Sequence, residues 1–341
     1  MLIIFGINFY IYGTGAFSYP YLENEDSWAH TFGVKYISMN RGAFEEAAGK
    51  IRYINPYPPS YDLLLGVLHQ TSNSMYFILK FFNALIISLS TVFFYFFVKE
   101  LSGDKNKALF AAFALMSIPA FMSHFIWGIS LAIPLYFVVF YAMERIKHDK
   151  KWWIVAALSM VAGFTASPTH STYLGLFLVL YFLTKSILQR KILIHDALAG
   201  IAGVALSFIF WWGPVLMRYG LFGTLKGLGL SPGKGVGALN IAGTGDRTYT
   251  FSDFFFAQEQ NMINNPIGIG VVLSLLTTLA LVFVLMKFKK LLKKENHWLV
   301  LTVVWFVFTF YAVNASKFPI KISPFRAWML LAIPVCILAA Y

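Results

Sequence analysis

The sequence YPYLENEDSWAHTFGVKYI, from Tyr19 to Ile37, decides how the rest of the chain is interpreted. It places three carboxylates, Glu23, Glu25 and Asp26, directly after a first apolar segment in a chain that has few charges. Carboxylates beside lipid are unfavourable unless they are hydrated or paired with a cation or a positively charged ligand. The stretch therefore predicts a polar site at the membrane surface of an apolar protein.

The composition indicates an integral membrane protein. Of the 341 residues, 58% are hydrophobic and only 12% are charged, whereas soluble domains are about a quarter charged. Apolar runs of about 20 residues recur along the chain, which favours membrane-spanning helices over a β-barrel. The net charge of +12 does not indicate nucleic-acid binding, because the Lys and Arg residues lie in short loops between apolar runs. The single cysteine, Cys336, excludes a disulfide framework.

The apolar runs predict one all-α domain over residues 1–341, a polytopic membrane protein with about ten transmembrane helices. The expected spans are Leu2–Tyr12, Met75–Val98, Ala108–Phe121, Trp127–Glu144, Trp152–Ala166, Thr172–Thr184, Ile194–Met217, Pro266–Met286, Trp298–Val313 and Ala327–Tyr341.

Loop charges predict the orientation. With the N-terminus inside, the connections KELSGDKNK, RIKHDKK, KSILQRK and KFKKLLKKENH are all cytoplasmic, and each is rich in Lys or Arg. Two longer polar segments, 14–73 and 218–265, then lie on the external face of the cell membrane. In the first, we expect surface helices over Gly42–Ile51 and after Pro58. In the second, the glycine-rich Gly229–Gly245 is expected to be a mobile lid.

The order of two motifs resembles a known family. DSWAHTFGVKYI, followed by YPPSYDLLLGVL, resembles the first external loop of GT-C glycosyltransferases, most closely the catalytic subunits of archaeal and bacterial oligosaccharyltransferases. The resemblance implies a GT-C-like fold with Asp26 as the catalytic carboxylate and with Glu23 and Glu25 beside it. Chemistry favours the same residues, because glycosyl transfer from a lipid phosphate needs a base or a cation-binding carboxylate near the headgroups.

The sequence departs from the oligosaccharyltransferase pattern after the third predicted span. In PAFMSHFIWGISLAIPL, Pro119 and Gly128 stand where the family has them, His124 stands near an arginine position, and Ser130 and its neighbours replace the second acidic motif. A hard divalent cation, Mg²⁺ or Mn²⁺, needs several oxygen ligands, and Asp26 is the one candidate ligand by family analogy. The departure favours GT-C relatives that use a polyprenyl-monophosphate sugar and one principal carboxylate.

Arg326, at the start of the last span, is the candidate contact for the donor phosphate, because its guanidinium can bind phosphate in a bidentate manner. The alternative is an arginine that anchors the helix end at the interface. The other candidates for substrate binding are Tyr57, His30, His124, Trp127, His170, Arg218 and Glu259.

The leading hypothesis is a membrane glycosyltransferase. It would transfer a sugar from a polyprenyl (dolichyl)-phosphate donor, embedded among membrane lipids, to a protein, glycan or lipid acceptor on the external face. One alternative is a divergent oligosaccharyltransferase that uses a lipid-diphosphate oligosaccharide. Another is a polytopic transporter or flippase, which usually carries ionisable residues near the bilayer midplane.

Overall fold

The computed structural model describes residues 1–43, 57–227, 238–239, 248–256, 267–287, 293, 296–318 and 321–341. Within these ranges the elements are helices, apart from two strands of two residues each, β1 (Ala238–Leu239) and β2 (Lys321–Ile322). The two strands pair in parallel and tie the segment after α11 to the segment before α16. The all-α prediction is confirmed.

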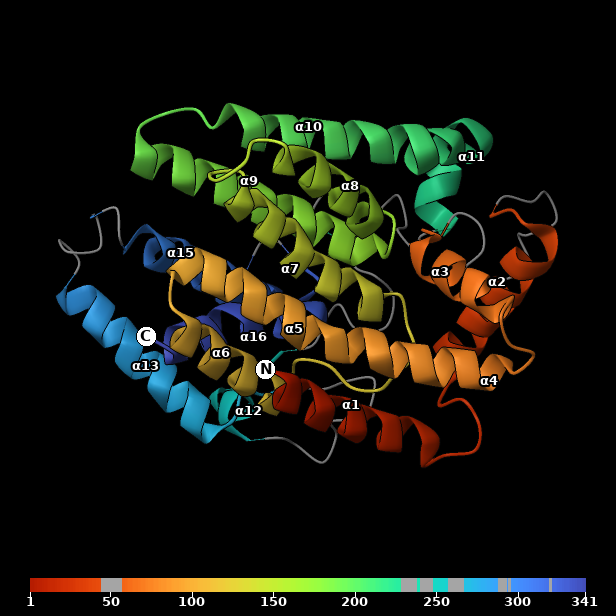
Figure 1. Ribbon diagram of the computed structural model, residues 1–341, viewed down its shortest axis with the longest axis horizontal. Helices are drawn as coiled ribbons and strands as arrows, with labels where there is room; N and C mark the ends of the chain where they lie inside the picture. Colours follow the sequence, from red (N-terminus) through yellow and green to blue (C-terminus); the bar gives the residue numbers. More distant parts are fainter. Residues whose placement is uncertain are drawn as a thin grey trace.

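Long helices lie side by side along the length of the molecule (Figure 1). α5 packs on α7, α7 on α8, α8 on α10 and α15 on α16. The helices are α1 (Leu2–Phe17), α2 (Glu25–Asn40), α3 (Ser60–His69), α4 (Met75–Phe77), α5 (Asn83–Ser102), α6 (Lys105–Ser117), α7 (Ile129–Arg145), α8 (Trp152–Phe164), α9 (Pro168–Gln189), α10 (Ile194–Ser207), α11 (Gly213–Gly227), α12 (Phe251–Phe255), α13 (Val271–Met286), α15 (His297–Val313) and α16 (Pro324–Ala339). The π-helical segments η2 (Ile78–Phe82) and η3 (Phe208–Trp212) and the short 3₁₀ segment η5 (Ala315–Lys317) complete the set.

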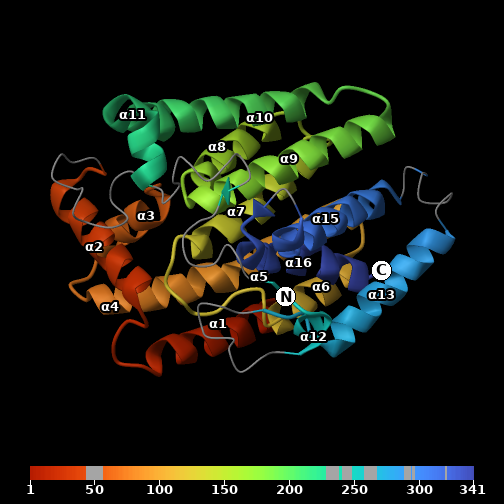
Figure 2. The same cartoon turned by 180° about the vertical axis from the view of Figure 1, so that it is seen from behind.

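α16 lies in the middle of the bundle (Figure 2). It packs against α6, α13 and α15, and every residue from Ala327 to Leu338 is buried. A helix that is apolar all round is stable only when it is covered on all sides. Pro324 occupies the first turn, where its missing N–H costs no hydrogen bond. The buried helix thereby fixes the position of Arg326 in its first turn.

Three helical segments are long and apolar enough to cross a membrane: Met75–Ser102, Pro168–Gln189 and Ile194–Leu225. A membrane-spanning helix needs about 20 residues, so the expected count of ten spans is not confirmed. The shorter apolar helices, of 10–17 residues, are Leu2–Phe17, Trp152–Phe164, Val271–Met286, His297–Val313 and Pro324–Ala339.

Some expected boundaries move for a local reason. The helix expected over Ala108–Phe121 ends at Ser117, since Pro119 follows and the residue before a proline avoids the helical region. Ile118 is accordingly extended, with ψ of 120°. The helix expected after Pro58 is confirmed, because α3 begins at Ser60.

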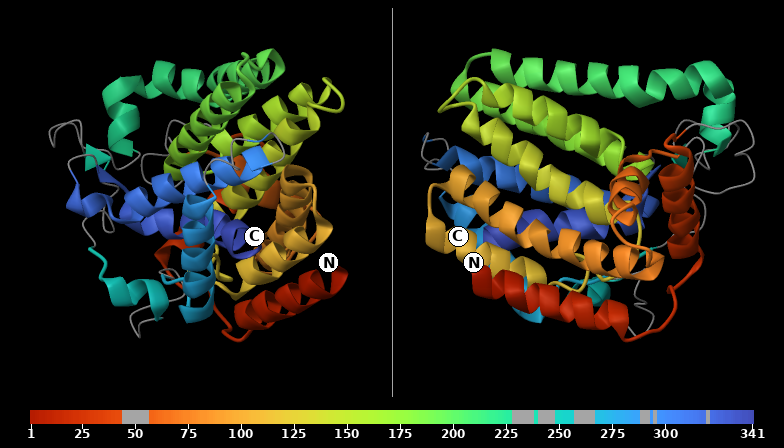
Figure 3. Two further views of the ribbon diagram at one scale, coloured as in Figure 1. Left: turned by 90° about the vertical axis from the view of Figure 1, so that its left-hand side faces the viewer. Right: turned by 45° about the vertical axis from the view of Figure 1, so that its right-hand side comes forward.

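One end of the molecule carries α2 and α3, which lie across the ends of the long helices (Figure 3). We call it the α2–α3 end. α2 and α3 pack on each other. The helix expected over Gly42–Ile51 falls outside the described residues from position 44 onward. Of the lid expected over Gly229–Gly245, the structure describes only Ala238 and Leu239.

The opposite end gathers charged groups. The facing ends of α5 and α6, α7 and α8, α9 and α10, and α13 and α15 all lie there (Figure 1). Glu144 accepts hydrogen bonds from Tyr181 at 2.8 Å and Lys185 at 3.1 Å. Glu100 lies 2.7 Å from His148 Nε2 and 3.0 Å from Lys147 Nζ. The four basic connections therefore share one end, as alternating topology requires.

Candidate active site

The segment between α6 and α7 is held in place at the α2–α3 end. The buried Asn83 amide donates to the carbonyl oxygens of His124 and Phe125, each at 3.0 Å. The Tyr12 hydroxyl donates to the carbonyl of Met122 at 3.2 Å. Hydrogen bonds from helix side chains to its backbone carbonyls restrict the conformation of this segment. The segment therefore holds its own side chains in fixed positions.

Trp127, in this segment, forms a platform for Arg326. The guanidinium carbon of Arg326 lies 4.7 Å from the centre of the Trp127 ring and 5.2 Å from that of Phe325. Trp127 is buried, and its indole N–H has no hydrogen-bond partner. A guanidinium this close to an aromatic ring is attracted to the ring face. The two rings therefore help to hold Arg326 in place at the start of α16.

Tyr57 connects Arg326 to the carboxylates. Burial raises the pKa of the Tyr57 hydroxyl, the Arg326 charge lowers it, and the charges of Asp62 and Asp26 raise it. A hydrogen bond joins Tyr57 to the Ser167 side chain. The charges of Arg326, Asp62 and Asp26, from distant parts of the sequence, therefore all act on the Tyr57 hydroxyl.

His170 lines the same region. Its side chain is fully buried, its Nδ1 lies 3.5 Å from Ser167 Oγ, and its Nε2 has no hydrogen-bond partner. The charge of Arg326 acts on its ring. The Ser60 N–H donates to Thr165 O at 2.9 Å, which joins the start of α3 to the segment before α9.

His30 joins two other parts of the site through hydrogen bonds. Its Nδ1–H donates to Asp62 Oδ1 at 2.7 Å, and its Nε2 accepts a hydrogen bond from the Gly128 N–H at 3.2 Å. Because Nε2 is an acceptor, the proton is on Nδ1 and the ring is neutral. Burial raises the pKa of Asp62, and His30 partly offsets the rise. The sequence predicts that His30 binds substrate, but the structure engages both ring nitrogens within the protein.

Glu23, His124 and Lys80 form a second polar group. The Glu23 side chain is 8% exposed, and its Oε1 lies 4.0 Å from His124 Nε2. Ser27 donates to Glu23 Oε2 at 3.3 Å. Lys80, on the π-helical segment η2, is buried and donates to the carbonyl of Tyr19. Irregular helical turns of this kind are frequent at functional sites.

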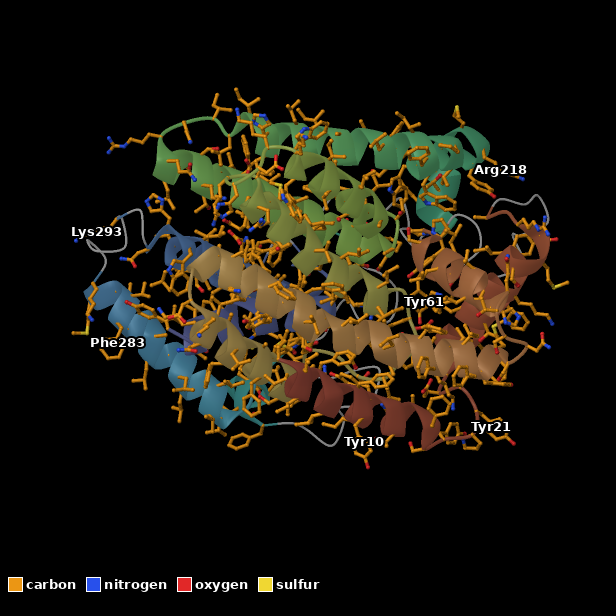
Figure 4. All side chains as sticks on the ribbon, in the orientation of Figure 1. Tyr10, Tyr21, Tyr61, Arg218, Phe283 and Lys293 are labelled. Carbon is orange, nitrogen blue, oxygen red and sulfur yellow. The ribbon has the colours of Figure 1, made fainter. Side chains whose placement is uncertain are left out.

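Two residues of the site were not found by sequence reasoning. A lysine near the outer end of an apolar run usually extends to the interface, yet Lys80 is buried and bonds to the Tyr19 carbonyl. Asp62 was not considered, although a carboxylate in the apolar run YDLLLGVL is a usable signal. Tyr61, beside it, donates to Asn83 Oδ1 at 2.7 Å and lies inside the molecule (Figure 4).

The remaining candidates are placed differently. Asp26 is half-buried and donates its backbone N–H to the capping side chain of Asn24 at 2.7 Å, and Glu25 is exposed. Arg218 is exposed on α11, 5.9 Å from the ring of Tyr219, at the edge of the molecule (Figure 4). Glu259 lies outside the described residues.

A hard divalent cation needs several oxygen ligands close together. Within the described ranges, no three His, Cys, Asp or Glu side chains group closely enough to hold a metal ion. The Glu23 carboxylate lies within the electrostatic influence of the Lys80 ammonium group. A cation at Asp26 stays a prediction from the family resemblance, and no step below depends on one.

Solved structures match this arrangement of helices. The oligosaccharyltransferase of Archaeoglobus fulgidus in its apo form matches with a TM-score of 0.60 at 14% identity, over 99% of this chain and 50% of that chain. ArnT from Cupriavidus metallidurans bound to undecaprenyl phosphate matches with a TM-score of 0.59 at 14% identity, over 99% of this chain and 59% of that chain. The A. fulgidus oligosaccharyltransferase AglB, in complex with an inhibitory peptide and a dolichol-phosphate, matches with a TM-score of 0.59 at 14% identity, over 99% of this chain and 49% of that chain.

These neighbours define the class of fold: the chain is GT-C-like, as the motifs at its start predict. No family model matches the sequence, and no curated protein matches it. The chain spans between 49% and 59% of the length of the three neighbours. At 14% identity the likeness concerns the fold alone, so the roles of individual residues rest on the contacts described above.

Proposed function

We propose that the protein is a membrane glycosyltransferase that transfers a sugar from a polyprenyl-phosphate donor to an acceptor. The observation that carries the proposal is the Arg326 guanidinium, stacked 4.7 Å from the Trp127 ring within electrostatic reach of Tyr57, which also feels the charge of Asp26. An anion-binding arginine, an aromatic face and a carboxylate are the groups that a sugar phosphate requires. A second role for Arg326, as a simple interfacial anchor, would not need the stacked geometry.

The proposed roles follow from the positions. Arg326 binds the donor phosphate through its in-plane N–H groups, and Tyr57 lies beside it. Trp127 and His170 border the sugar. Asp26 is the catalytic carboxylate on the donor side, where its charge acts on the sugar as the bond to the phosphate breaks. Undecaprenyl phosphate and dolichol-phosphate are bound in the neighbouring structures of ArnT and AglB, which supports a lipid phosphate as the ligand here.

We also propose the membrane orientation. The α2–α3 end, with the site, lies on the external face of the cell membrane, and the opposite end, with the four basic connections, is cytoplasmic. The donor is proposed to be a monophosphate, because the described residues provide one principal carboxylate beside the phosphate-binding arginine. A divergent oligosaccharyltransferase with a diphosphate donor remains the alternative, and strict dependence on Mg²⁺ or Mn²⁺ would favour it.

Binding of undecaprenyl phosphate to the purified protein tests the donor site. Arg326→Lys keeps the charge but loses the planar, stacked donor, a contact of roughly 0.5–2 kcal/mol. The affinity for undecaprenyl phosphate is therefore expected to fall by about 2- to 30-fold, at tenfold per 1.4 kcal/mol.

Arg145→Lys is the matched control. Arg145 lies 5.5 Å over the ring of Trp152 at the opposite end of the molecule, so the same substitution should leave the affinity unchanged. Equal affinities for wild type and Arg326→Lys, or an equal loss in both variants, would contradict the proposed phosphate site.

A further inference from the structure

The Glu23, His124 and Lys80 group is separate from the Arg326–Trp127 contact, although one segment carries parts of both. His124 and Trp127 are three residues apart in the rigid connection between α6 and α7. His124 faces Glu23, whereas Trp127 faces Arg326. The site therefore has two polar parts, one suited to an anion and one that contains a carboxylate, an imidazole and an ammonium group.

Glu23 is buried with one oxygen unused. Oε2 accepts from Ser27, but Oε1 has no hydrogen-bond partner although the side chain is 8% exposed. Leaving a buried carboxylate oxygen unpaired costs free energy, because the oxygen gives up its hydrogen bonds to water. Native structures keep such groups mainly where a ligand or water completes them.

The space between Glu23 Oε1 and His124 Nε2 is wide enough for one oxygen atom. Glu23 Oε1 and His124 Nε2 are 4.0 Å apart, too far for a direct hydrogen bond. An oxygen atom placed about 2.8 Å from each could donate to Glu23 and accept from a protonated Nε2. A hydroxyl group has both capacities in one atom. The ring of His124 packs against Gly15, where an added β-carbon would lie only 2.6 Å from its Nδ1.

The charges around Glu23 tune its basicity. Burial raises the pKa of Glu23, whereas its own backbone N–H, the ammonium group of Lys80 and the Ser27 hydroxyl lower it. Burial and the same ammonium group lower the pKa of His124, which keeps the ring neutral. The charge of Glu23 also acts on the Tyr61 hydroxyl, and Glu25 and Asp26 follow Glu23 in the first turn of α2. A base with a pKa above its ordinary value, beside a neutral histidine, suits proton transfer.

We propose that Glu23, His124 and Lys80 form the acceptor subsite, and that it takes a hydroxyl group as the nucleophile. The inference rests on the proposed glycosyltransferase function and adds the chemical class of the acceptor. Glu23 accepts the proton, His124 donates to the acceptor oxygen and positions it, and Lys80 is a positioning residue that holds Glu23 ionised.

The transfer balances in atoms and electrons. The acceptor oxygen forms a bond to the anomeric carbon of the sugar while the bond from that carbon to the phosphate oxygen breaks. The hydroxyl proton moves to Glu23, and the bond electrons leave with the polyprenyl phosphate, whose added negative charge Arg326 stabilises. No oxidant, reductant or further reactant is required.

A carboxamide acceptor fits this subsite less well. The lone pair of an amide nitrogen is delocalised into the carbonyl group, whereas the lone pairs of a hydroxyl oxygen are localised. A single carboxylate can therefore activate a hydroxyl more readily than an amide. The 4.0 Å gap also fits one oxygen atom between two side chains, not an amide group that must be held at both its nitrogen and its oxygen.

The test uses the full-length purified protein with radiolabelled hexoses linked to undecaprenyl phosphate. Release to water, transfer to glycerol and transfer to acetamide are measured across pH. The inference predicts transfer to water and glycerol and at least about tenfold less to acetamide. Glu23→Gln should lower kcat by about 100-fold or more, the scale for losing an acid–base group, and should abolish the acidic limb of the kcat/KM profile, while undecaprenyl phosphate still binds.

The position of the acidic limb in Lys80 variants is a readout that would not change if Lys80 had only a structural role. Because its charge lowers the pKa of Glu23, Lys80→Met should shift the acidic limb to higher pH, and Lys80→Arg should keep it near the wild-type position. Glu100→Gln is the control, since Glu100 also lies beside a lysine and a histidine but at the opposite end.

The outcomes separate the two proposals. Turnover that prefers acetamide, an unchanged acidic limb in Glu23→Gln, or a limb that Lys80→Met does not move would overturn the acceptor assignment and leave the glycosyltransferase intact. Wild-type protein that binds undecaprenyl phosphate but turns over none of the donors would overturn both the proposed function and the inference. An acidic limb that Glu100→Gln moves as Lys80→Met does would also count against the assignment.

Discussion

Replacing Gly33 with alanine is expected to destabilise the protein by breaking the hydrogen bond between Asp62 and His30. A β-carbon at Gly33 would lie 2.2 Å from Asp62 Oδ2, about 1 Å closer than an ordinary contact between carbon and oxygen. Asp62 is fully buried and holds His30 at 2.7 Å. Moving its carboxylate by about 1 Å takes the His30 Nδ1 bond beyond hydrogen-bond distance.

The magnitude follows from two opposing terms. A lost charge-assisted hydrogen bond costs about 1.5–3 kcal/mol. Alanine in place of glycine inside α2 returns roughly 0.5–1 kcal/mol, since the unfolded chain loses less freedom. The free energy of unfolding should therefore fall by about 0.5–2.5 kcal/mol, the difference between these terms.

Gly13→Ala is the matched control. Gly13 lies inside α1, and a β-carbon there meets nothing within 4 Å, so this variant should be as stable as wild type or slightly more so. Denaturant unfolding in detergent, with Trp fluorescence as the signal, measures all three proteins. In an Asp62→Ala background, Gly33→Ala should cost nothing further, because the clashing oxygen is gone. If Gly33→Ala proves as stable as Gly13→Ala, the close approach of Gly33 and Asp62 does not occur as described.

The other predictions concern chemistry, stability and orientation. Asp26→Asn should lower kcat by about 100-fold or more while the affinity for undecaprenyl phosphate stays within a few-fold; near-full transfer activity would remove Asp26 from the catalytic role. Burial raises the pKa of Asp62 above its reference value of 3.8, so the proton binds the folded chain more tightly than the unfolded one. Stability from this group should be greatest below pH 3.8 and should fall as the pH rises through the raised pKa, and Asp62→Asn should lose that slope in pH-dependent unfolding. A cysteine at Ser231, in a Cys336→Ser background, should react with impermeant reagents added from outside the cell; labelling only from the cytoplasmic side would reverse the orientation.

Several local features could be predicted from the sequence because they depend on neighbouring residues. Pro58 and Pro59 predict the start of α3, and the structure begins the helix at Ser60. The count of spans could not be predicted in the same way. Hydropathy identifies apolar segments but not where each helix ends. The helix Trp152–Phe164, for example, is shorter than the usual length of a membrane span.

The candidate site, too, could be predicted from the sequence only in part. The cluster of Glu23, Glu25 and Asp26 is visible in the sequence, yet their environments differ: Glu23 is buried, Asp26 half-buried and Glu25 exposed. Lys80 shows the limit most clearly. Its place near the end of an apolar run suggested a side chain that reaches water, but it is buried and donates to the carbonyl of Tyr19.

The lack of charge and the repeated apolar runs can be read from the chain alone and indicate a helical membrane protein, and two short motifs predict the GT-C-like fold. Which side chains meet depends instead on how the helices pack. Arg326 contacts Trp127, and Glu23 faces His124, although nothing in the spacing of these residues along the chain relates them. Hydropathy and helix signals act over a few neighbouring residues, whereas such contacts depend on how the α6–α7 connection and the buried α16 are held by the packing of the whole bundle.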